Sequence, residues 1–276
     1  MQKNDFYVAD AFASTRFTGN PAGVLIFDDY PADSILQNIA TEINHAETSF
    51  LVKIDENNYK LRWFTPSVEV NLCGHATLAA AHILKQLGHI YEAVHFHTRS
   101  GLLSVKVASL SKDSLAGQYV MNFPAPECKP LSVSQDITDN LALQPLFTGM
   151  AGEDCMFELS SAMDVVNYQP DFQALSAIES RGVLITAKAE AYNEKYGTAF
   201  DIITRCFFPR VGVPEDPVTG SAHCYIAKYW AERLNKNKFK SLQASKRSGI
   251  IEIEIVTDRA NLTGSAITTM VGEVFF

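Results

Sequence analysis

The sequence predicts an α+β protein made of two strand-rich halves, each curled around one central helix. Two observations predict this class. The chain carries one order of segments twice, and each copy contains a helix-forming segment whose apolar residues lie on every face. A helix that is apolar all round has to be enclosed, and the strands of its own half are the material available to enclose it.

The internal repeat consists of four pairs of segments that occur in the same order at slowly growing offsets. Each half contains a Pro-initiated helix, an apolar strand with an Arg before a Pro, an apolar helix that opens on Gly, and an Arg-Ser-Gly turn that leads into a strand. The pairs are PADSILQNIATEI (31–43) with PDFQALSAIESRG (170–182), KLRWFTP (60–66) with ITRCFFP (203–209), GHATLAAAHILKQLG (74–88) with GSAHCYIAKYWAERL (220–234), and RSGLLSVKV (99–107) with RSGIIEIEI (247–255).

The repeat divides the chain into residues 1–117 and residues 118–265. Each half is expected to run through strands, a surface helix, more strands, a Pro-bearing loop, the buried helix and closing strands. Residues 266–276 follow the second Arg-Ser-Gly turn and can complete either half. Duplicated halves of this kind are expected to pack about a pseudo-twofold axis.

The composition excludes several classes of function. The net charge of -8 comes from 31 acidic and 23 basic residues without a long run of either sign, which opposes nucleic-acid binding. No stretch is apolar enough for a signal peptide or a membrane span, so we expect a cytoplasmic protein that does not enter membranes. The 5 cysteines, without a C-x-x-C pair, are expected to be free thiols rather than disulfides or zinc ligands.

Polar residues gather at the start of both central helices. Cys73 and Gly74 open the first helix, and Thr219, Gly220 and Ser221 open the second. A helix N-terminus offers unpaired N–H groups and the positive end of the helix dipole, so two such ends that converge make a pocket for an anion such as a carboxylate. One such loop alone is read as an ordinary cap and turn, but two matched loops favour a ligand site.

Three further residues are candidates for moving or holding a proton. Glu47 lies just before a strand, where it is either a surface carboxylate or a reactive group held by the scaffold. His75 is a satisfied helix-mouth histidine, a ligand or a general acid. Because no second His or carboxylate stands beside it at metal spacing, no metal site is expected. Asp216 lies in a turn fixed by Pro214 and Pro217 and is a credible ligand for an amino or hydroxyl group.

Four motifs resemble the PhzF family, the phenazine biosynthesis-like isomerases. They are FTGNPAGV (17–24), AETSFL (46–51), CGHATLAAA (73–81) and EDPVTGSAH (215–223), which occur in this order over the whole chain. The resemblance implies the diaminopimelate epimerase fold, in which two pseudo-symmetric halves each have a barrel-like, mostly antiparallel sheet around a central helix, with the active site in the cleft between them. It also implies a homodimer.

The resemblance assigns roles to individual residues. The family's catalytic glutamate falls on Glu47, its glycine-histidine pair on Gly74 and His75, and its aspartate and serine on Asp216 and Ser221. In the phenazine enzyme the glutamate moves a proton within a cyclic amino acid without a cofactor or metal.

One departure concerns the racemases of the same fold, which use two opposed cysteines as base and acid. Cys73 stands at the first of these places, whereas the second holds Thr219, whose hydroxyl cannot act as the base for a carbon acid near neutral pH.

The sequence therefore predicts a cofactor-independent isomerase that moves a proton on a small carboxylate-bearing, amino or hydroxy acid-like substrate. Glu47 is the general acid and base, assisted by His75 and Asp216. The alternatives are a non-catalytic small-molecule binding protein on the same fold and a thiol-based amino acid racemase or epimerase. The expected substrate-binding residues are Cys73, Gly74, Gly220, Ser221 and Thr219.

Overall fold

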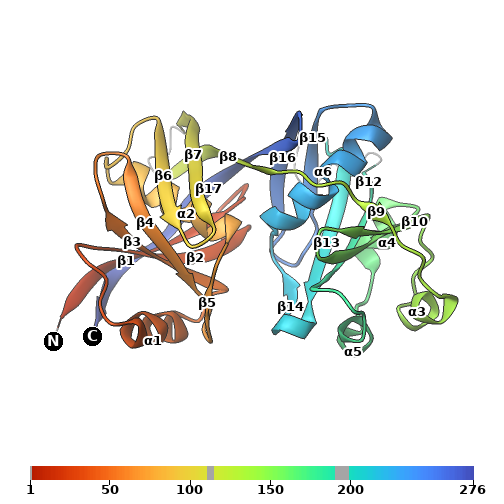
Figure 1. Cartoon of the computed structure of the whole chain (residues 1–276), viewed down its shortest axis with the longest axis horizontal. Coiled ribbons are helices and arrows are strands. Elements are labelled where there is room, and N and C mark those ends of the chain that lie inside the picture. The colour runs from red at the N-terminus through yellow and green to blue at the C-terminus, as the bar shows by residue number, and fades with distance from the viewer. Residues whose placement is uncertain (1, 111–114, 190–198) are drawn as a thin grey trace. The chain divides into compact units, whose positions relative to one another are not determined.

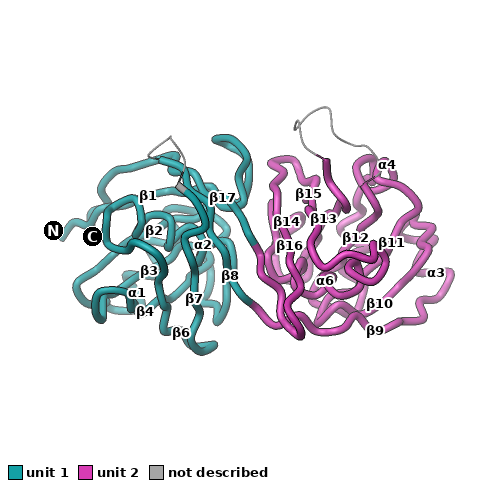
Figure 2. Tube along the Cα trace, turned by 90° about the horizontal axis from the view of Figure 1, so that it is seen from above, with its two compact units in different colours: residues 1–122, 263–276 teal, residues 123–262 magenta. Residues whose placement is uncertain are grey.

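The computed structural model describes residues 2–110, 115–189 and 199–276, which form two compact units (Figures 1 and 2). Unit 1 comprises Met1–Asn122 and Thr263–Phe276, and unit 2 comprises Phe123–Leu262. The terminal segment therefore belongs to unit 1. No helix in the described part of the chain is both long and apolar enough to cross a membrane.

Unit 1 is a closed ring of strands around one helix. Its strands are β1 (Lys3–Ala11), β2 (Asn20–Phe27), β3 (Glu47–Lys53), β4 (Asn58–Phe64), β6 (Ala93–Thr98), β7 (Gly101–Leu110), β8 (Ala116–Pro124) and β17 (Arg259–Phe275). The pairs β2–β3 and β4–β6 are parallel, whereas β1–β17, β1–β2, β3–β4, β6–β7 and β7–β8 are antiparallel. Pairing of β8 with β17 closes the ring.

The central helix of unit 1, α2 (Gly74–Gln86), is enclosed as the sequence predicts. Every side chain from His75 to Leu84 is buried. The buried polar side chain in the middle of this helix, His82, has partners for both ring nitrogens, because its imidazole contacts the hydroxyl of Tyr119 at 2.9 Å and the hydroxyl of Thr268 at 3.0 Å. The outer helix α1 (Asp33–Ile43) buries Leu36, Ile39 and Ala40 against the sheet.

Unit 2 repeats this order of pairings. The strands that carry the repeat are β11 (Asp154–Glu158), β12 (Val183–Lys188), β13 (Ile202–Phe208), β15 (Lys238–Gln243) and β16 (Gly249–Val256). The pair β11–β12 is parallel, β12–β13 antiparallel, β13–β15 parallel and β15–β16 antiparallel, as in β2–β3, β3–β4, β4–β6 and β6–β7 of unit 1. The repeat seen in the sequence is thus a repeat of topology. The remaining elements of this unit are β9 (Lys129–Pro130), α3 (Gln135–Asn140), β10 (Phe147–Ala151), α4 (Ala162–Asn167), α5 (Phe172–Ser176), a 3-10 turn (Pro209–Val211), β14 (Val213–Asp216) and α6 (Gly220–Leu234).

Two helices of unit 2 differ from the expectation. The central helix α6 is not enclosed on every face, since Tyr225, Lys228 and Tyr229 are half-buried. Its inner face still packs tightly, and the indole of the buried Trp230 donates to Thr186 Oγ1 at 3.1 Å. The helix expected within 170–182 is shorter and ends at Ser176. Beyond this point the backbone turns away from the helix, and the N–H of Arg181 donates to the Glu153 carbonyl at 2.9 Å.

Each unit uses an Arg-Glu ion pair to hold the hairpin that leads to its central helix. In unit 1, Arg62 of β4 contacts Glu69 of β5 (Glu69–Val70) through two bonds of 2.8 Å. In unit 2, Arg205 of β13 contacts Glu215 of β14 through bonds of 2.7 and 3.0 Å. The two arginines are those that the repeat aligned, so their shared role is to fix the loops before α2 and α6.

Candidate functional site

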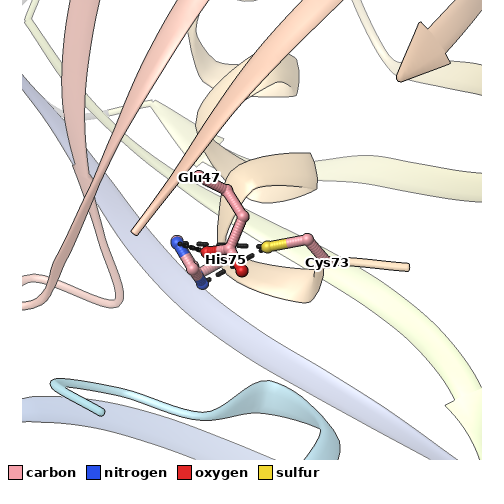
Figure 3. A group of neighbouring side chains, drawn as sticks. All are labelled: Glu47, Cys73 and His75. Atoms are coloured by element: carbon pink, nitrogen blue, oxygen red, sulfur yellow. Dashed lines mark hydrogen bonds and ion pairs between the residues drawn. The ribbon is translucent and has the colours of Figure 1, made fainter. Parts of the chain in front are cut away.

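Three predicted residues meet at the start of α2 in unit 1. Glu47 is the first residue of β3, Cys73 is the N-cap of α2, and His75 lies in the first turn of that helix. Glu47 Oε2 lies 3.2 Å from His75 Nε2, and Cys73 Sγ lies 3.5 Å from His75 Nδ1. Figure 3 shows the three side chains pointing toward one another from β3 and α2.

Residues 17–24, one of the sequence motifs, help to position the side chain of His75. Asn20, the first residue of β2, is buried, and its amide Nδ2 donates to His75 Nδ1 at 3.2 Å. With Nδ1 as acceptor, the neutral imidazole carries its hydrogen on Nε2 and donates it to Glu47. Gly19 permits the turn before Asn20, because its φ is +72° and a Cβ there would lie 2.3 Å from the Ala11 carbonyl oxygen.

His75 is held in its neutral form. Burial, together with the smaller effect of the charge of His45, lowers its pKa from 6.5 to about 3. The contact with Glu47 is therefore a hydrogen bond to a carboxylate rather than an ion pair. The neutral imidazole that donates to Glu47 keeps this carboxyl group oriented.

We expect His75 to remain neutral throughout the neutral and mildly acidic range. In the unfolded chain His75 takes up a proton near pH 6.5, whereas in the folded chain it does so near pH 3. The contribution of neutral His75 to the free energy of unfolding is therefore fully present above pH 6.5 and is lost as the pH falls toward 3. An imidazole nitrogen NMR titration, with His75→Gln to assign the signal, checks this expectation. A midpoint near 6.5 would contradict it.

The other predicted residues meet at the start of α6 in unit 2. Thr219, the N-cap of α6, donates its hydroxyl to Asp216 Oδ2 at 2.5 Å. The buried Gln243 holds this loop, because its Oε1 accepts from the Thr219 backbone N–H and its Nε2 donates to the Asp216 carbonyl, both at 2.8 Å. Gly220 then begins the helix, and the half-buried Ser221 follows it.

Sequence reasoning missed Arg181, which lies beside Ser221. Its Nη2 donates to Ser221 Oγ at 3.3 Å. The same guanidinium forms bonds of 2.8 and 2.5 Å with the buried Asp154 and packs over the rings of Phe208 and Tyr225. Arg181 falls in the repeat segment 170–182 but in none of the motifs that indicated a site, so its position beside Ser221 could be found only from the fold.

The strand register explains why Glu47 has no counterpart in unit 2. Aligning Arg62 with Arg205 makes Thr48 equivalent to Val183, because these residues pair with Phe64 and Phe207. Glu47 therefore corresponds to Gly182. A Cβ at Gly182 would lie 2.2 Å from the ring of Phe208, so no carboxylate fits there without a shift.

The structure thus brings the predicted residues together in two groups. Glu47, Cys73 and His75 contact one another in unit 1, at the mouth that Gly74 opens. The second group, in unit 2, is Asp216, Thr219, Gly220 and Ser221. That the two groups share one cleft stays a prediction. A separate cavity of about 710 Å³ in unit 2 is lined by residues of α3, α5, β10 and β11 and by none of these residues.

Comparison with known proteins covers almost the whole chain. The family profile described as phenazine biosynthesis-like protein matches residues 9–272. An uncharacterized isomerase of Halalkalibacterium halodurans is 42% identical over 278 residues, which cover 99% of this chain and 99% of that protein. An uncharacterized isomerase of Pseudomonas aeruginosa is 39% identical over 271 residues, with 98% of each chain covered.

Solved structures show the same relationship. The crystal structure of a phenazine biosynthesis protein of the PhzF family from Enterococcus faecalis aligns with a TM-score of 0.90 at 34% identity and covers 100% of both chains. A hydroxyproline epimerase from Agrobacterium vitis, with bound trans-4-hydroxy-L-proline, aligns with a TM-score of 0.62 at 11% identity over 99% of this chain and 92% of that chain. The second similarity concerns the fold alone.

Proposed function

Because this chain belongs to the PhzF, or phenazine biosynthesis-like, family of isomerases, we propose that it moves a proton on a small carboxylate-bearing substrate without a cofactor. Family membership confirms the resemblance of the four motifs. The expected diaminopimelate epimerase-like fold is confirmed as well, with the PhzF structure and the epimerase as structural neighbours. The isomerase class follows from the relatives, whereas the substrate and the acting residues are the proposal.

The observation that carries the proposal is the hydrogen bond between His75 Nε2 and the carboxylate of Glu47. Glu47 accepts a proton from a substrate carbon, and the electron pair of the broken C–H bond remains delocalised on the substrate. The resulting carboxylic acid then returns the proton to a different carbon. His75 keeps the carboxylate aimed at the reacting atoms, and Asn20 keeps the imidazole in the tautomer that does so.

The group at the start of α6 suits the recognition of a substrate carboxylate. Its first-turn N–H groups and the Ser221 hydroxyl are donors, and the guanidinium of Arg181 adds a fixed positive charge beside Ser221. Asp216 is an acceptor suited to an amino or hydroxyl group. Its neighbour Glu215 is committed to Arg205, which leaves Asp216 as the candidate acid of this loop.

Two observations disfavour a thiol racemase. The hydroxyl of Thr219, at the position of the second thiol, donates to Asp216. Cys224 lies in the same helix, but burial raises its pKa to about 12, so the thiolate that could act as a base is hardly populated near neutral pH.

We therefore expect Cys73→Ser to retain activity to within about tenfold, a change of about 1.4 kcal/mol in the barrier, because the thiol is not the base. Serine keeps the small polar side chain at the N-cap while it removes the acidity of the thiol. Steady-state kcat and KM of the variant check this expectation. A loss of several orders of magnitude would restore the thiol mechanism.

A proton-exchange screen tests the proposed function. The chain is incubated in D₂O with a panel of cyclic and acyclic amino and hydroxy acids, and the loss of C–H signals is followed by NMR. The proposal predicts exchange and conversion for at least one acid. Tight binding of an acid without exchange at any carbon would instead support the non-catalytic binding protein.

A further inference from the structure

Glu47, Cys73 and His75 contribute three different metal-ligating groups to one spot in unit 1. One ligand atom from each residue lies within 4.8 Å of the others. We propose that this group is an inhibitory site for a zinc-type divalent cation. Sequence spacing concealed it, because Glu47 is distant from the other two residues in the chain and folding of β3 beside α2 brings it into contact.

The distances fit a tetrahedral cation after small side-chain movements. Ligand bonds of about 2.0–2.2 Å to N or O and about 2.3 Å to S place neighbouring ligand atoms about 3.3–3.6 Å apart. His75 Nε2 lies 3.2 Å from Glu47 Oε2 and 4.0 Å from Cys73 Sγ. Three protein ligands leave the fourth position open, as at catalytic zinc sites.

The charges of the site also suit a divalent cation. A thiolate and a carboxylate balance the two positive charges, and an imidazole that ligates through one nitrogen is neutral. Nε2 can ligate if the ring hydrogen moves to Nδ1. Asn20 then turns its amide so that its oxygen accepts from Nδ1–H, which is the outer-shell contact typical of a metal-bound histidine.

The cation would inhibit because it occupies the lone pair with which Glu47 accepts the substrate proton. This part of the inference rests on the proposed function, and inhibition should be competitive with substrate. The binding of the cation itself does not depend on any turnover. Direct observation of cation binding therefore tests the metal site separately from the proposed isomerase function.

Cobalt serves as the optical probe of the site. The full chain is titrated with Co²⁺, and the absorption of a thiolate-bound, tetrahedral ion is recorded. Wild type should show a thiolate-to-cobalt charge-transfer band that Zn²⁺ abolishes by displacement. Cys73→Ser should lose this band, and Glu47→Gln should weaken binding by at least the roughly 10- to 100-fold that the loss of an outer-shell partner costs.

Cys128→Ser is the matched control, because Cys128 is a half-buried free thiol far from these ligands in the chain. It should bind Co²⁺ as wild type does. No charge-transfer band in wild type, or the same band in Cys73→Ser, would overturn the inference even if the isomerase is active. If binding is found and a substrate is known, activation rather than competitive inhibition by Zn²⁺ would overturn the inhibitory role.

Discussion

Replacement of Glu47 by Gln is expected to lower kcat by about 100-fold to 10,000-fold or more, the range that a general acid or base contributes. Glutamine keeps the size of the side chain and its hydrogen-bonding reach to His75 but has no basicity. The variant should therefore fold and bind substrate as wild type does. Proton exchange in D₂O and the thermal midpoint, measured on both proteins, check these expectations.

Glu42→Gln is the matched control for this experiment. Glu42 is an exposed carboxylate on α1, so its replacement makes the same chemical change outside the site. It should leave kcat within about twofold, since it lies on the outer helix. Equal turnover by Glu47→Gln and wild type would exclude Glu47 as the base.

The second large effect concerns stability. Replacement of Arg205 by Met is expected to lower the free energy of unfolding by about 3–5 kcal/mol, because it leaves the partly buried Glu215 without its partner. The guanidinium is itself buried, and its Nη1 donates to the Tyr168 carbonyl at 2.6 Å, a bond that methionine also removes. Urea denaturation followed by circular dichroism measures the change.

The double variant with Arg205→Met and Glu215→Leu distinguishes the ion pair from packing. It removes the unpaired charge, so it should recover part of the stability lost in Arg205→Met but not the bond to Tyr168. A double variant as unstable as the single one would show that Glu215 is not the cause.

The sequence predicted the order of the elements because the order is written twice. Apolar residues on every face of 74–88 identified an enclosed helix, and α2 is enclosed. The same pattern was wrong for α6, whose half-buried Tyr229 donates its hydroxyl to the carboxylate of Glu158. Tyrosine counts as apolar in a pattern, but its hydroxyl allows it to lie at the edge of the core.

The sequence did not predict which side chains of different segments contact one another. The repeat showed that Arg62 and Arg205 are equivalent, but it did not show that Glu69 and Glu215 are their partners, because a partner depends on strand register. Likewise, Asn20 lies in a motif of the sequence, but its role became clear only from its hydrogen bond to His75 in the fold.

The same limit applied to the candidate site. The helix mouths were found because Gly74 and Gly220 open matched segments. Arg181 was missed because its approach to Ser221 depends on the early end of α5 and on the bond to Asp154. The absence of a second Glu47 became understandable only when the register placed Gly182 against Phe208.

The fate of the transferred hydrogen decides whether one carboxylate performs both proton transfers. Once a substrate is known, it is labelled with deuterium at the carbon that loses its proton, and the product of a single turnover in H₂O is examined by NMR and mass spectrometry. Transfer by Glu47 alone predicts that a measurable fraction of the product retains the label at the new carbon. The mechanism would be contradicted if the hydrogen at the new carbon came entirely from solvent and Glu47→Gln formed the product as fast as wild type.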